Sequence, residues 1–304
     1  MLQRRQLREA ALIALTVFFL LIGVSWARHI DEDCIAFQEK TINVPGSSLN
    51  ITSWNDSPEE QEFLALFLYF YGKEYPKTYS ILYVFPSMFQ LVDLKNSESK
   101  KRNFAINPPL LNGWVDLQLK FEEKLEVRIA GWPGPLIKVP NAFHVEKVKL
   151  KGSNTTVNCR DDMVAWRVNH TRQVIPVAGA APYRLTMFSG SSFTPKFISA
   201  EEELSLGLEG EAYVIGQGVP RLPPYKDHNF TLACNHSDSR VNSCYLQALD
   251  SCVIGPLVCS EIDCSITVST GHGYFFLLLI RKTVNNTEDD ATTLDITESR
   301  VIGR

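Results

Sequence analysis

Few residues of this chain stand in the patterns that catalysis requires. The six histidines are scattered along the sequence, which also lacks H-E-x-x-H, G-x-S-x-G and a phosphate-binding glycine loop. The stretch "GQG" at 216–218 lacks the third glycine and the following helix of a dinucleotide site. We therefore expect no enzyme, no catalytic residue, no cofactor and no metal, and we interpret the histidines as surface or loop residues.

Two enzyme classes stay open as alternatives. A sandwich-fold glycoside hydrolase needs two carboxylates that meet in space, but Glu122 and Glu123 lie in an expected turn and Glu126 on an outer strand face. The triplet "DED" at 31–33 matches the metal-binding triplet of Golgi glycosyltransferases. It directly follows an apolar segment, and no nucleotide-binding βαβ pattern comes after it, so a solvated acidic flank explains it better.

The seven cysteines predict disulfides rather than a metal site. Cys34 and Cys159 bracket the first strand-rich region and are expected to bridge its first and last strands. The remaining cysteines crowd near the carboxyl end and permit two bridges and one leftover thiol: Cys234, Cys244, Cys252, Cys259 and Cys264. A zinc site formed by Cys234, His236 and Cys244 is the competing interpretation, but the spacing contains no paired C-x-x-C.

The amino-terminal segment, residues 1–28, predicts entry into the secretory pathway. Three arginines precede an apolar run at 10–26, and the acidic triplet follows it. We expect a cleaved signal peptide, because the run is at the lower limit of the roughly 17–25 residues that span a bilayer. A retained signal anchor is the alternative. Both outcomes place the rest of the chain outside the cytosol, secreted or tethered as a type II single-pass membrane protein.

Glycosylation acceptors agree with this compartment. Asn-x-Ser/Thr triplets predict glycans on exposed loops or wet strand faces at Asn50, Asn154, Asn169, Asn229, Asn235 and Asn285. A further triplet at Asn55 is followed by Pro58, which disfavours its use.

A strongly alternating ribbon at 115–132 indicates the fold class. In "VDLQLKF" apolar and polar residues alternate with a period of two, and after a short charged interruption "LEVRI" resumes the pattern. This predicts two antiparallel strands with one buried face and one wet face. The following "GWPGPL" turns the chain into another strand.

Composition and strand density set the domain organisation. The chain is 45% hydrophobic and 21% charged, so it can bury ordinary cores, and 304 residues at roughly 150 per domain predict two domains. We expect an all-β protein: an antiparallel jelly-roll-like β-sandwich at 30–160, then a smaller disulfide-containing, Cys-rich β domain at 172–284 and a polar tail at 285–304. The net charge of −4 gives no footprint for nucleic acid.

The segment "LNGWVDLQLKFEEKLEVRIAGWPGPLIKVP" at 111–140 resembles the central strands of concanavalin A-like or laminin-G-like jelly rolls. Within residues 35–159 the chain is also similar to uncharacterised invertebrate extracellular proteins that carry such a sandwich. The resemblance implies recognition of carbohydrate or protein outside the cell. A galectin-like sugar motif and a clustered Asp/Asn calcium signature are both absent from the sequence.

The expected function is therefore that of a non-enzymatic extracellular or lumenal glycoprotein, a binding module for a glycan or an extracellular protein. A single-pass type II adhesion or structural protein and a sandwich-fold hydrolase are the alternatives. Trp132 is the candidate ligand-binding residue, because a rigid Pro- and Gly-flanked turn can hold its indole out for stacking. The competing interpretation is that this ring covers a sheet edge. Contact with a membrane is expected only through residues 10–26.

Overall fold

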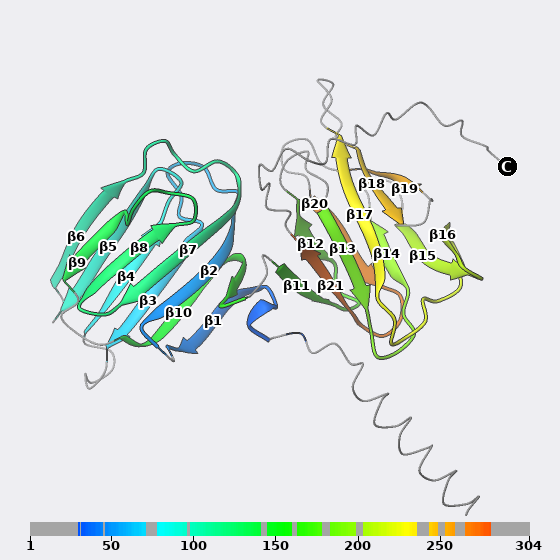
Figure 1. Cartoon of the computed structure of the whole chain (residues 1–304), viewed down its shortest axis with the longest axis horizontal. Helices are drawn as coiled ribbons and strands as arrows, with labels where there is room; N and C mark the ends of the chain where they lie inside the picture. Colours follow the sequence, from blue (N-terminus) through cyan, green and yellow to red (C-terminus); the bar gives the residue numbers. More distant parts are fainter. Residues whose placement is uncertain are drawn as a thin grey trace, which may run out of the picture.

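The structure is a computed structural model, and it consists of two β-sandwiches that lie side by side (Figure 1). It describes residues 30, 32–44, 46–70, 78–95, 98–140, 145–159, 163–177, 183–198, 203–235, 243–248, 253–258 and 265–280. Within these ranges there is no α-helix, and the single helical turn is the 3-10 segment η1 (Glu32–Cys34). The all-β prediction is therefore confirmed.

The described residues of the first sandwich form ten strands. They are β1 (Phe37–Asn43), β2 (Ser48–Asn55), β3 (Leu64–Phe70), β4 (Thr78–Val84), β5 (Met88–Lys95), β6 (Glu98–Ala105), β7 (Gly113–Phe121), β8 (Lys124–Ile129), β9 (Ile137–Pro140) and β10 (Val145–Val157).

Two antiparallel layers of these strands enclose the first core, and β10 belongs to both. The amino-terminal part of β10 pairs with β1 and β3, and β3 continues through β4 and β5 to β6. The last residues of β10 pair with β2, which continues through β7 and β8 to β9. This pairing is that of an antiparallel jelly-roll-like sandwich, as the sequence predicted.

The alternating ribbon forms β7 and β8. Every second residue of β7 is buried, and Phe121 lies opposite Leu125 across the hairpin. The apolar run around β3 is a central strand between β10 and β4. Leu64, Ala65 and Leu66 are all buried, which explains why this strand shows no alternation.

Eleven strands lie in the described part of the second sandwich. They are β11 (Met163–Val168), β12 (Gln173–Pro176), β13 (Tyr183–Phe188), β14 (Pro195–Ile198), β15 (Glu203–Glu209), β16 (Ala212–Gly216), β17 (His228–Asn235), β18 (Ser243–Ala248), β19 (Val253–Val258), β20 (Ser265–Thr270) and β21 (Phe275–Ile280).

One layer of the second sandwich has the strand order β11-β21-β13-β17-β18-β19, and the other has β12-β20-β14-β15-β16. Their inner faces form a separate core that includes Trp166, Phe193 and Phe275. Since β11 contributes Val164 and Trp166 to this core, the second unit begins before residue 172.

Three tryptophans join the two sandwiches. The ring of Trp114 lies 5.2 Å from that of Trp54 in the first sandwich and 6.2 Å from that of Trp166 in the second. The indole nitrogen of Trp166 donates to the side-chain oxygen of Asn154 on β10 at 3.0 Å. Packing and a hydrogen bond therefore connect the units in addition to the peptide chain.

A disulfide closes the first sandwich beside this junction. Cys34 and Cys159 are bonded across 125 residues of sequence with their Cα atoms 4.7 Å apart, as the cysteine pattern predicted. Next to it, the amide of Ala36 donates to the carbonyl of Ala165 at 2.8 Å. The bridge thus holds the start of the first sandwich against β11.

The amino-terminal segment 1–28 and the tail 285–304 lie outside the described residues. Within the part of the chain that the structure describes, no helix has the length and apolar character needed to cross a bilayer.

Candidate binding site

Four loops gather at one end of the second sandwich, the lower end in Figure 1. The strand registers place Arg167 and Phe188 opposite Phe276, and Met187 opposite His228. Because these residues stand at the ends of β11 and β13 and the starts of β17 and β21, the adjoining loops emerge together. They are 169–172, 189–194, 217–227 and 271–274.

Two exposed tyrosines stand at this end. Tyr225 is 72% exposed and Tyr274 is 38% exposed, although large aromatic rings are normally covered. Both are held by Ser189: the amide of Tyr225 donates to the Ser189 carbonyl at 2.9 Å, and the Ser189 hydroxyl donates to the Tyr274 carbonyl at 2.7 Å. We call Tyr225, Tyr274 and the adjacent Arg167 the tyrosine platform.

The Tyr274 side of the platform rests on a stack of side chains. The guanidinium of Arg167 lies 4.6 Å from the centre of the Tyr274 ring, within the range of a cation–π contact. The edge of this ring meets Phe276 at 5.8 Å between centroids, and Phe276 stacks on Phe188 at 5.4 Å. These contacts limit the orientations open to Tyr274 and Arg167, so little conformational entropy remains to be lost on binding.

The loop that carries Tyr225 is tied down just before this residue. Phe193 and Leu222 exchange two backbone hydrogen bonds, at 3.2 and 2.8 Å. Tyr225 itself has a φ of +56°, a conformation that non-glycine residues adopt only where the surroundings impose it. The exposed ring is therefore presented by a fixed backbone.

A buried histidine supports the same loop. His228 is fully buried; its Nε2 lies 3.1 Å from the Pro223 carbonyl and its Nδ1 lies 2.9 Å from the Tyr213 hydroxyl. A neutral ring protonated at Nε2 satisfies both contacts, donating to the carbonyl and accepting from the phenol. Burial lowers the pKa of His228 from its ordinary 6.5, against the opposing effect of the Pro223 carbonyl. The neutral form that holds Pro223 is thus favoured near neutral pH.

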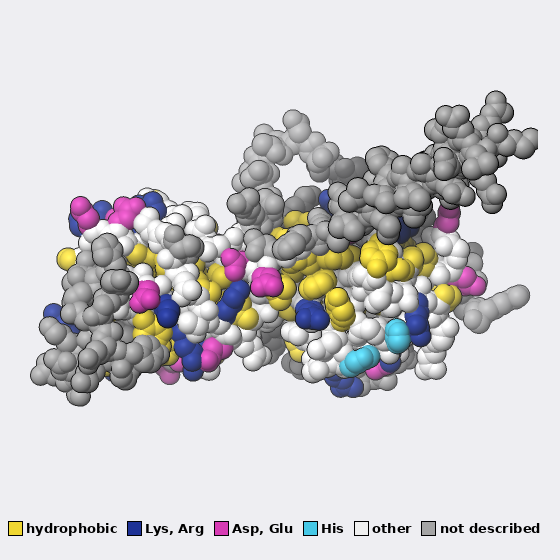
Figure 2. Space-filling view, turned by 90° about the horizontal axis from the view of Figure 1, so that it is seen from below, with side chains coloured by type: hydrophobic (Ala, Val, Ile, Leu, Met, Phe, Trp, Pro, Cys, Tyr) yellow, Lys and Arg dark blue, Asp and Glu magenta, His cyan; other side chains and the backbone are white. Residues whose placement is uncertain are grey.

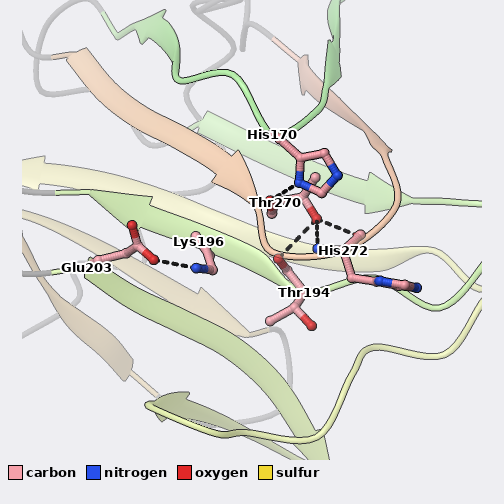
Figure 3. A network of polar contacts seen from close by, with 6 residues as sticks. All are labelled: His170, Thr194, Lys196, Glu203, Thr270 and His272. Carbon is pink, nitrogen blue, oxygen red and sulfur yellow. Dashed lines mark hydrogen bonds and ion pairs between the residues drawn. The ribbon is translucent and has the colours of Figure 1, made fainter.

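The loops around the platform meet at Thr270 (Figure 3). The Thr270 amide donates to the carbonyl of Asn169 at 3.0 Å, and the Thr270 carbonyl lies 2.9 Å from Nδ1 of His170. The Thr270 hydroxyl lies 2.7 Å from the carbonyl of His272 and 3.2 Å from that of Thr194. One buried threonine thereby links three of the four loops.

The Thr270 network ties the loops together, and the Thr270 hydroxyl in it is not activated as a nucleophile. The Thr270 hydroxyl donates to backbone carbonyls, so neither His170 nor His272 acts as a base toward it. Lys196 and Glu203 in the same view form an ion pair on neighbouring strands. Across the described ranges, no group of His, Cys, Asp or Glu could hold a metal ion. The contacts that the described residues make at this end are ring contacts, hydrogen bonds and ion pairs.

The structure places the predicted ligand residue Trp132 elsewhere. Trp132 is half-buried and packs against the core of the first sandwich. Glu122 and Glu123 are exposed in the β7–β8 turn. Lys138 and Arg128 hold the pKa of the Glu126 carboxyl below its usual value, with ion pairs at 3.1 and 3.2 Å, so that Glu126 is charged at neutral pH.

The glycosylation acceptors occupy different environments. Asn50 on β2 and Asn169 in a loop are exposed, whereas Asn154 and Asn229 are half-buried. Asn55 is fully buried and its amide nitrogen donates to the Leu111 carbonyl at 3.1 Å. The side chain of Asn235, and Asn285 altogether, lie outside the described residues.

The register sets the backbones of Cys234 and Cys244 opposite each other on β17 and β18. Their side chains lie outside the described part of the chain, as do Cys252, Cys259 and Cys264 and the zinc alternative at His236.

Sequence reasoning missed all three platform residues. Arg167, Tyr274 and Tyr225 come from three separate segments, none of which carries a recognised motif. A usable signal was present in the loop composition, because "NHTR", "SGSSF" and "GHGY" contain the Ser, Gly, Asn and Tyr that are typical of recognition loops.

No protein-family model and no curated protein matches the sequence. Among solved structures the chain is similar to a double variant of human galectin-16, with 13% identity and a TM-score of 0.32, over 40% of this chain and 90% of that one. It is also similar to domains LG4-5 of the mouse laminin alpha1 chain, with 11% identity and a TM-score of 0.25, over 80% of each chain. A third similar structure is the binding domain of botulinum neurotoxin DC in complex with SialylT, with 8% identity and a TM-score of 0.25, over 83% of this chain and 84% of that one. These are weak resemblances to jelly-roll, concanavalin A-like sandwiches.

Proposed function

We propose that this chain is a non-enzymatic binding module that recognises a glycan or a protein through the tyrosine platform. The observation that carries the proposal is the pair of exposed tyrosines, Tyr225 and Tyr274, whose backbones are bound to one serine by hydrogen bonds of 2.9 and 2.7 Å. Exposed aromatic side chains with Arg beside them are the commonest anchors of binding interfaces. Because the backbone is already held at both tyrosines, less entropy is lost when they are covered.

We further propose that the protein works in the secretory pathway or outside the cell, secreted or tethered through residues 10–26. The Cys34–Cys159 disulfide supports this compartment, because structural disulfides persist in oxidising surroundings. The acceptor triplets at Asn50 and Asn169, both on exposed side chains, are consistent with it. The mass of the mature amino terminus tests the choice between secretion and tethering: a start at Trp26 or Arg28 would exclude the anchor.

Screening the full chain against a glycan array and a panel of extracellular proteins tests the platform. The double variant Tyr225→Ser, Tyr274→Ser should lose binding to whatever ligand the unmodified protein captures. Tyr183 is 7% exposed and belongs to the core of the same sandwich, so a Tyr183→Phe variant changes a tyrosine outside the platform and serves as the control. Retained binding by the double variant, with unchanged unfolding, would place the binding site elsewhere.

The same screen separates a binding module from the alternative hydrolase. Sugars that bind should be recovered intact after prolonged incubation with the protein. Turnover of a bound sugar that disappears when one acid is replaced would overturn the non-enzymatic part of the proposal.

A further inference from the structure

The surface around the tyrosine platform is rich in cationic side chains. Arg172 in the first loop, Arg221 and Lys226 in the loop of Tyr225, and Arg167 in the platform are all exposed. Figure 2 looks onto this end of the molecule and shows Lys, Arg and His side chains over the second sandwich. Exposed acidic side chains also stand at this end, Asp227 beside Lys226 and Glu209 and Glu211 in the β15–β16 turn.

Two of these cations are not neutralised by an ion pair within the described residues. Glu203 already pairs with Lys196, and Asp227 is engaged in an interaction within the chain. Within the described ranges, neither Arg172 nor Arg221 has an ion-pair partner. Their charge is therefore available to a ligand.

The cationic side chains at this end have a one-sided hydrogen-bonding capacity. Arg and Lys side chains only donate, and the side-chain oxygen of Asn169, an acceptor within the same loops, is taken by the amide of Thr171 at 2.7 Å. Hydroxyl groups at this end, such as those of Thr171 and Ser191, both donate and accept. Carboxylates accept and do not donate, so they match the guanidinium and ammonium groups.

The exposure of Tyr225 favours a macromolecular partner. Sites for single sugars or small molecules surround most of the ligand. The Tyr225 ring is 72% exposed, so it does not lie in an enclosing pocket. Open Tyr and Arg side chains on several loops are typical of protein interfaces.

We propose that the platform binds an acidic segment of a protein, in which Asp or Glu carboxylates alternate with apolar side chains. This inference rests on the proposed function and names its ligand class. The carboxylates contact Arg172, Arg221 and Lys226, and the apolar side chains pack on Tyr225 and Tyr274. The attraction between these exposed charges is screened by salt.

Three immobilised probes test the inference with the full chain: a peptide in which Glu alternates with Leu and Tyr, the same peptide with Gln for Glu, and heparin. We expect binding to the Glu peptide that weakens as salt is raised, with little binding to the Gln peptide. The double variant Arg172→Ser, Arg221→Ser should weaken binding to the Glu peptide by about two- to fivefold for each charge removed. Arg184 is exposed on β13 at the opposite end of the sheet, so Arg184→Ser is the matched control and should bind normally.

The other outcomes separate a failure of this inference from a failure of the proposed function. Equal binding of the Glu and Gln peptides, or binding to heparin alone, would overturn the acidic-protein inference. If no probe binds while a neutral array ligand is lost in the double tyrosine variant, the proposed function stands and this inference fails. If the tyrosine variant keeps all binding, both fail.

Discussion

Gly207 on β15 lies under the loop that presents the platform, and its replacement by alanine should displace this loop. A Cβ atom at Gly207 would stand 2.3 Å from the Pro220 carbonyl oxygen and 2.7 Å from the Val219 Cβ. Ordinary contact begins near 3.4 Å, so the Pro220 backbone must retreat by about 1 Å. The neighbouring backbone bonds that hold Tyr225 oppose this movement.

The magnitude follows from two opposing effects. Overpacking of a closely fitted site costs about 1–3 kcal/mol, and the lower chain entropy of alanine in the unfolded state returns about 0.5–1 kcal/mol. We therefore expect Gly207→Ala to lower the free energy of unfolding by about 1–2 kcal/mol. Binding through the platform should weaken in parallel, because Tyr225 moves with the loop.

Gly216 on the neighbouring strand β16 provides the control. A Cβ atom there would meet Val219 at 3.8 Å, an ordinary contact, so Gly216→Ala should unfold at the same urea concentration as the unmodified chain or slightly above it. Urea titration with the disulfide intact measures both variants. If Gly207→Ala has the same midpoint as Gly216→Ala, the argument from close approach is wrong.

Three further predictions concern the bridge, the buried histidine and the junction. Replacing Cys34 and Cys159 by serine removes a cross-link spanning 125 residues and should lower the free energy of unfolding by about 2–5 kcal/mol; an unchanged urea midpoint would contradict this. Because the pKa of His228 is lowered by folding, its contribution to stability is present above its unfolded value of 6.5 and falls as the pH drops below it. Thermal melts at decreasing pH should show a smaller fall in melting temperature for His228→Gln than for the unmodified chain. An equal fall in both proteins would refute the assignment. Trp166→Phe keeps a ring in the core but removes the 3.0 Å hydrogen bond to Asn154, which should cost about 0.5–1.5 kcal/mol in calorimetry; Asn154→Ser should then add little to the phenylalanine variant.

Two strands of the first sandwich were not predicted, and their sequences explain why. The strand β6 (Glu98–Ala105) is polar enough to look like a loop, but it stands at a sheet edge, where charged residues guard against unwanted pairing. In β2 (Ser48–Asn55), the alternation is weakened because Ser53 faces the interior, where it lies 2.8 Å from the Thr155 hydroxyl. A hydrogen bond replaces the apolar contact in that position.

The sequence by itself determined the all-β class, the β7–β8 hairpin and the Cys34–Cys159 bridge. These features depend on a period of two along single strands and on the placement of one cysteine pair, which are local or directly countable patterns. Only the tertiary structure decided that the exposed aromatics lie at one end of the sandwich, because Arg167, Tyr225 and Tyr274 belong to separate segments. Strand register and three-dimensional packing bring them together, and neither is written in the residues of any one loop.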